Sequence, residues 1–111
     1  MRKLNLKDYT VKDKVPDRLN LGQEIDIEVL YRVKDSVINL LFTRELGLNG
    51  AELVRANMLA QKIEACENEA LLEEAEWQRL TMAVETFKGF GKHDVELVTR
   101  INGAEEVEVK A

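Results

Sequence analysis

The stretch EIDIEVLYRVKDSVINLLFTREL, residues 24–46, decides the fold class, because its hydrophobic period changes near the middle. In residues 24–33 apolar and polar side chains alternate, and Leu30 is the one apolar residue on the polar face. A period of two predicts a β-strand that buries one face and exposes the other, as in an antiparallel sheet packed on a core. The apolar face comprises Ile25, Ile27, Val29, Tyr31 and Val33.

Residues 34–46 follow this strand without a loop and predict a short helix. Asp35 or Ser36 can cap its N-terminus, since their side-chain oxygens accept backbone N–H groups, and Gly47 can end it. Apolar residues occupy nearly every side of the helix, which predicts that it is buried or forms an interface. The candidate interaction residues in this helix are Val37, Ile38, Leu41 and Phe42.

The remainder of the chain predicts short strands before this stretch and helices after it. Residues 3–6 and 9–11 could form strands, and residues 15–22 predict a turn or loop because they contain proline, asparagine and glycine. Amphipathic helices are predicted over residues 50–66, 73–88 and 94–102, the first of them capped by Asn49, and residues 105–110 predict an edge strand or a frayed tail.

Strands therefore come first and helices later, which is the α+β pattern. We expect a small N-terminal antiparallel sheet followed by three or four packed helices, with a C-terminal edge strand as a further element. The whole chain, residues 1–111, predicts a single domain. Within it residues 1–33 are expected to form mainly strands, residues 35–102 mainly helices, and residues 103–111 a tail or edge strand.

Composition excludes several classes of function. A net charge of −5 argues against a general nucleic-acid binder, which normally has a basic surface. No apolar run approaches the length of about 20 residues that spans a bilayer, and the basic start lacks the apolar core of a secretory signal. The single cysteine, Cys66, cannot form an internal disulfide, which favours a reducing, cytoplasmic setting, in the host cytoplasm for a phage protein.

The sequence also lacks the groups that a catalytic or metal centre requires. Cys66 lies on the apolar side of a predicted helix, where a buried and inert thiol is the common case. His93 is the only histidine, and one histidine with one cysteine gives no recognisable zinc spacing. We therefore expect no enzymatic activity, no metal and no cofactor.

An acidic segment runs from residue 64 to residue 76, with six glutamates and no basic residue. One interpretation is an ordinary solvated surface, and the other is an acidic patch that binds a basic partner. The candidate residues of such a patch are Glu69, Glu73, Glu74 and Glu76.

The stretch FKGFGKHDVELVTRI, residues 87–101, contains two glycines that flank Phe90. It resembles the helix-hairpin-helix family of DNA-binding motifs, whose pattern is matched here by Phe87, Gly89, Phe90, Gly91, Val95 and Val98. The resemblance implies that Gly89, Gly91 and Lys92 contact a DNA phosphate, because glycine allows backbone N–H groups to approach it closely. A tight turn between two packed helices explains the same residues without any ligand.

A second resemblance concerns the general character of the chain and no particular motif. The small acidic chain, with its short sheet and the helix LLEEAEWQRLTMAVE, is similar to small accessory proteins encoded in tailed-bacteriophage genomes. That resemblance implies the role of a viral assembly factor, an adaptor or an inhibitor of a host protein. The leading hypothesis is a non-enzymatic protein-interaction module that binds a protein partner or itself. The alternative is a helix-hairpin-helix binder of the nucleic-acid backbone.

Overall fold

The strand β1 (Arg2–Asn5) lies at the centre of a three-stranded antiparallel sheet, between β4 and β5. The structure is a computed structural model, and it describes residues 1–108. Its α+β class agrees with the sequence prediction. The other elements are β2 (Tyr9–Pro16), β3 (Glu24–Tyr31), α1 (Val33–Leu41), the 3₁₀ turn η1 (Arg44–Leu46), α2 (Gly50–Ala65), β4 (Glu69–Leu72), α3 (Glu74–Thr86), the 3₁₀ turn η2 (Lys92–Asp94), α4 (Val95–Asn102) and β5 (Glu105–Glu106).

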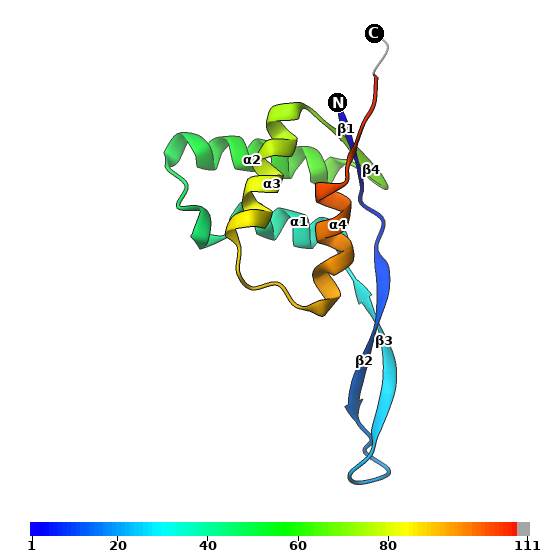
Figure 1. The fold of residues 1–111 in the computed structure, drawn as a ribbon. Helices are drawn as coiled ribbons and strands as arrows, with labels where there is room; N and C mark the ends of the chain where they lie inside the picture. Colours follow the sequence, from blue (N-terminus) through cyan, green and yellow to red (C-terminus); the bar gives the residue numbers. More distant parts are fainter. Residues whose placement is uncertain (109–111) are drawn as a thin grey trace.

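The molecule consists of two parts of different character (Figure 1). The three-stranded sheet and the four helices form the body, which we define as residues 1–8 and 32–108. The strands β2 and β3 form a separate two-stranded antiparallel ribbon that projects away from the helices. We call this ribbon and its loop, residues 9–31, the arm. Its projection makes the molecule long and narrow, with extents of 58 × 33 × 22 Å.

All hydrophobic side chains that are buried within residues 1–108 lie in the body. The helix α1 packs against α2 and α3, and α3 packs in turn against α4, so that α1 and α3 each contact two other helices. From the sheet, Leu4 is fully buried, as is Leu72 on the neighbouring strand. The arm, residues 9–31, contributes no buried residue to this core.

The helix predictions are largely confirmed. Asn49 caps α2 as expected, since its Oδ1 accepts the N–H of Glu52 at 2.9 Å. The prediction for α1 was wrong at its start, because neither Asp35 nor Ser36 caps it. The helix begins at Val33, whose N–H donates to Oδ1 of Asp8 at 2.9 Å. A carboxylate distant in sequence therefore supplies this contact.

The sheet differs from the prediction in two ways. Strand β4 lies in the acidic segment, where the sequence predicted only a break before a helix, and its Ala70 pairs with Leu4 of β1. Strand β1 pairs with β4 and β5, and not with β2, so the ends of the chain complete the sheet. The predicted edge strand is confirmed at Glu105–Glu106, and its residues 109 and 110 lie outside the part that the structure describes.

Candidate functional site

The arm presents two faces of opposite character. Residues directly across an antiparallel pair lie on the same face, and the register places Val11 opposite Val29 and Val15 opposite Ile25. Ile27 lies on this apolar face as well, opposite Asp13. On the other face, two lysines lie directly across from two carboxylates, in the pairs Lys12–Glu28 and Lys14–Asp26.

The apolar face of the arm is only partly covered, since Val11, Val15 and Ile27 are half-buried and the other two apolar residues are exposed. Ile25 is 45% exposed and Val29 is 41% exposed. The sequence prediction that this strand packs its apolar face on the core is therefore wrong. The period of two is correct, but β3 belongs to a ribbon that extends beyond the body, so no layer lies against it.

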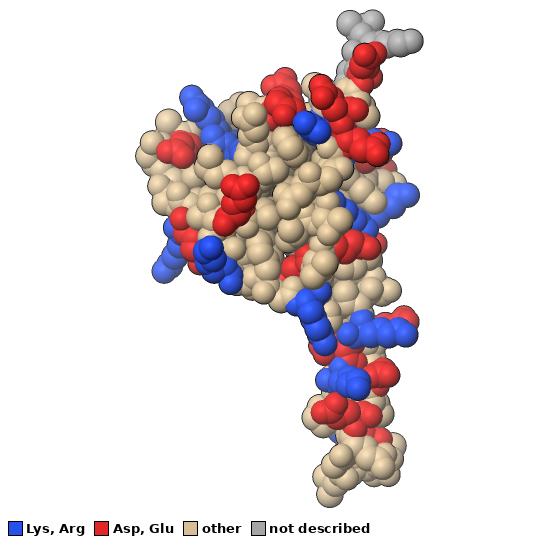
Figure 2. All heavy atoms as spheres, in the orientation of Figure 1, with Lys and Arg blue, Asp and Glu red and all other residues tan. Residues whose placement is uncertain are grey.

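The end of the arm carries two leucines that are almost completely exposed. Leu19 is 91% exposed and Leu21 is 98% exposed. Asp17 orders this loop, since its Oδ1 accepts the N–H of Leu19 at 2.9 Å and its Oδ2 accepts the side-chain amide of Asn20 at 3.1 Å. These hydrogen bonds lower the pKa of Asp17, so its carboxylate stays ionised. On the face drawn in Figure 2, the extremity of the arm shows almost no charged atoms.

Two stacked tyrosines anchor the arm to the body. The rings of Tyr9 and Tyr31 lie 4.5 Å apart and nearly parallel. The Tyr9 hydroxyl donates to the carbonyl oxygen of His93 at 2.7 Å, and the Tyr31 hydroxyl donates to Oδ1 of Asp94. Arg100 of α4 lies over the Tyr9 ring, 5.0 Å from its centre. The base of the arm is thus held by aromatic stacking, hydrogen bonds and a cation–π contact.

Both anchoring hydroxyls are shifted away from ionisation. Burial raises the pKa of Tyr31, and the hydrogen bond to Asp94 raises it further. Burial also raises the pKa of Tyr9. Neither hydroxyl therefore acts as a base near neutral pH, and the arrangement serves to hold the arm.

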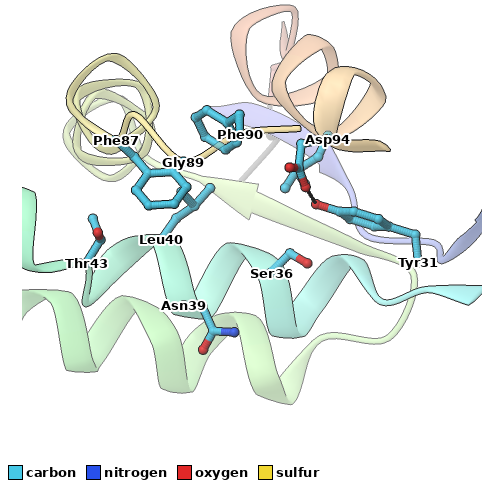
Figure 3. Close-up of a pocket in the computed structure, with 10 residues that line it drawn as sticks. Tyr31, Ser36, Asn39, Leu40, Thr43, Phe87, Gly89, Phe90 and Asp94 are labelled. Carbon is cyan, nitrogen blue, oxygen red and sulfur yellow. Dashed lines mark hydrogen bonds between the residues drawn. The ribbon is translucent and has the colours of Figure 1, made fainter. Parts of the chain in front are cut away.

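A pocket of about 370 Å³ lies beside this anchor, between α1 and the loop that follows α3. In Figure 3 the Phe87 ring and Leu40 lie together on one side of it, and the bonded pair of Tyr31 and Asp94 lies on the other. Phe87 and Phe90 pack edge to face, with ring centres 4.9 Å apart. Tyr31 therefore belongs both to the wall of this pocket and to the arm.

The two glycines of the helix-hairpin-helix resemblance have local structural explanations. The N–H of Gly91 donates to Oδ2 of Asp94 at 2.8 Å, so a carboxylate already occupies the position that a phosphate would take. Gly89 packs against Phe87, and a Cβ at this position would lie 2.5 Å from Cζ of that ring. Lys92 begins η2 and belongs to the same turn.

The predicted interaction surface on α1 requires correction. Val37 and Leu41 are fully buried in the core, because α2 and α3 cover that side of the helix. Ile38 is half-buried against the core, and Phe42 is partly exposed just beyond the helix end. Of the two interpretations offered by the sequence, burial holds for most of this helix, and Val37 and Leu41 cannot contact a partner.

The acidic segment does not form an isolated negative patch. Glu69 pairs with Lys3 at 3.2 Å, and Glu74 pairs with Arg2 at 3.2 Å. Glu76 pairs with Lys62 at 2.7 Å and also accepts the N–H of Glu73 at the start of α3. Basic residues from other parts of the chain therefore lie beside three of the four candidate glutamates.

The remaining chemical groups of the sequence analysis are accounted for locally. The Cys66 thiol donates to the carbonyl of Lys62 at 3.2 Å, and Nε2 of His93 lies 4.0 Å from Oδ2 of Asp13. Within residues 1–108 no group of three or more histidines, cysteines or carboxylates is placed to hold a metal ion. In the same range no helix has the length and apolar character needed to cross a membrane.

Sequence reasoning missed the arm as a site, although two signals were present. Leu19 and Leu21 stand in a segment predicted to be a loop, where large apolar residues have no core to join. The lysines at residues 12 and 14 are also opposite in charge to the acids of the following strand that they face. No family model, no curated protein and no solved structure matches this chain.

Proposed function

We propose that this chain is a non-enzymatic protein-interaction module that binds protein through its arm. The single observation that carries this proposal is the incompletely covered apolar face of the arm, which ends in two leucines that are more than nine-tenths exposed. An exposed apolar surface of this kind is typical of an interaction site, since leaving it in water is unfavourable.

The stability of the arm supports the same conclusion. An isolated two-stranded hairpin is at best marginally stable in water, and it needs a third strand or another layer on its apolar face. The body holds the arm at its base, through Tyr9 and Tyr31, and approaches it again at Asp13, whose Oδ2 lies 4.0 Å from Nε2 of His93. A partner that covered Val29, Ile27 and Ile25 would supply the missing layer.

We infer from the resemblance to small phage accessory proteins that this module acts as an assembly factor, an adaptor or an inhibitor of a host protein. An assembly role agrees best with an arm that projects from a small body, because such an arm reaches a surface that the body does not touch. We include a cytoplasmic setting in the proposal, which the single cysteine favours.

Site-specific photo-crosslinking tests the proposal. A photo-reactive amino acid at Val29 would lie on the apolar face, and one at the neighbouring residue Glu28 would lie on the polar face of the same strand. We expect irradiation to give protein adducts from position 29, both for the purified chain and for the chain in a lysate of its own cells. Position 28 is the matched control and should give few. Equal yields from both positions, or no adducts from position 29 in either preparation, would contradict the proposal.

A further inference from the structure

The body carries a second uncovered apolar site, a groove between α2 and α3 with a volume of about 560 Å³. Met58 forms part of this groove and is 64% exposed. The other residues that line it are Arg55, Leu59, Lys62, Ala75, Glu76 and Arg79.

The rim of this groove is basic. Lys62 and Glu76 neutralise each other in their ion pair of 2.7 Å. Within residues 1–108, neither Arg55 nor Arg79 takes part in an ion pair. The groove therefore offers an apolar floor beside two positive charges that have no counterpart in the body.

The end of the arm has the complementary character. Leu19 and Leu21 are almost completely exposed there. The residues nearest the tip, 16–26, carry three carboxylates and one basic residue, namely Asp17, Glu24, Asp26 and Arg18, and Asp26 lies across from Lys14.

We propose that the end of the arm of one copy docks in the α2–α3 groove of a second copy of this chain. The leucines would contact Met58, and the carboxylates would face Arg55 and Arg79. This inference rests on the proposed function, because it names the partner of the arm. The pocket beside Phe87 is less suitable as the acceptor, since Asp94 on its wall would repel an acidic loop.

The shape of the molecule indicates that this contact forms between two copies and not within one. In Figure 1, α2 and α3 lie toward the end of the molecule opposite the tip of the arm, so an arm that projects in this way does not reach the groove of its own chain. A contact between two different surfaces is heterologous, and it forms a closed ring or an open chain of copies. The smallest closed form is a dimer in which each copy seats its arm in the groove of the other.

Two variants test the proposal by sedimentation velocity over a range of concentrations. In the first, Leu19→Ser with Leu21→Ser removes the apolar end of the arm and leaves the groove intact. In the second, Arg55→Glu with Arg79→Glu reverses the groove and leaves the arm intact. The leucine pair should weaken self-association at least about a hundredfold, since each buried leucine contributes tenfold or more to binding. The arginine pair should weaken it as well, since the reversed charges would repel the carboxylates of the arm. Thermal unfolding of each variant checks that the body is still folded.

Mixing the two variants gives the decisive result. In the mixture the leucine variant supplies a working groove and the arginine variant supplies a working arm. We therefore expect a complex of one copy of each variant and nothing larger. Added salt should weaken the contact of the unmodified protein, because charge pairs contribute to it. An interface between two arms would instead let the groove variant associate like the unmodified protein, and that outcome would overturn the proposal.

The remaining outcome separates this inference from the proposed function. If the unmodified protein stays monomeric at every concentration, the second copy is not the partner and the inference fails. Adducts from position 29 with another protein in the lysate would then leave the proposed function in place. Absence of those adducts as well would remove both.

Discussion

The body and the arm use similar residues with opposite results. In β1, Leu4 faces the helices and is fully buried, whereas in β3 the equivalent apolar position Ile25 is 45% exposed. Both strands alternate along the sequence, and the difference lies only in what is packed against them. The comparison shows that an alternating pattern predicts a strand with one apolar face, while the presence of a second layer must come from elsewhere in the chain.

The largest expected difference between the two parts is in the response to loss of a leucine. Leu41→Ala in the body should lower the free energy of unfolding by about 2–5 kcal/mol, because it leaves a cavity in a packed core. Leu30→Ala in the arm is the matched control, and it should change that energy by no more than about 0.5 kcal/mol, since Leu30 is 54% exposed. Urea unfolding measures both. Similar losses would mean that the arm packs against the body in solution.

The loop between α3 and η2 offers a smaller contrast. Gly89→Ala should destabilise the protein by about 1–3 kcal/mol, since the new Cβ would displace the packed ring of Phe87. Gly91→Ala should change stability by less than about 0.5 kcal/mol, because the nearest atom to a Cβ there lies 3.9 Å away and its φ is −109°. Thermal unfolding compares the two. Equal effects would contradict the structural explanation given for Gly89.

The anchor of the arm should respond to alkaline pH. Burial, and then the hydrogen bond to Asp94, raises the pKa of Tyr31 above its ordinary value of 10.0. A group with a raised pKa in the folded state contributes its full stability below the unfolded pKa, and that stability is lost as the pH rises through the folded pKa. The protein should therefore lose stability above about pH 10, as Tyr31 begins to ionise in the unfolded chain.

Tyr31→Phe separates this effect from the titration of lysines. Urea unfolding of both proteins at about pH 8 and about pH 11 should show a smaller alkaline loss in the variant, since it has no hydroxyl at this position to ionise. If the variant and the unmodified protein lose stability in parallel, Tyr31 does not anchor the arm.

The smallest expected effect concerns nucleic acid. Asp94 already accepts the N–H of Gly91, and the net charge is −5, so we expect no binding of duplex or single-stranded DNA even at low salt. Fluorescence anisotropy measures this, with Lys92→Glu as the control. Salt-sensitive binding that Lys92→Glu abolishes would restore the helix-hairpin-helix interpretation and move the functional surface from the arm to the body.

The sequence by itself determined the local structure of most elements. Alternation identified β3, helical spacing identified α2, α3 and α4, and Asn49 was correctly recognised as a cap, because each of these signals depends on residues only a few positions apart. The short strand β4 escaped prediction, since four residues within an acidic segment acquire a strand conformation only through their pairing with β1. The same limit applies to Asp8, which caps α1 from a distant part of the chain.

The tertiary structure alone decided which apolar residues are covered. Val37 and Leu41 were candidate surface residues, and α2 and α3 bury them. Val29 and Ile25 were predicted to be buried, and the projection of the arm exposes them. A hydrophobic pattern records which side of an element avoids water, but burial is a property of two surfaces in contact. The second surface becomes known only when distant segments of the chain have been placed in space.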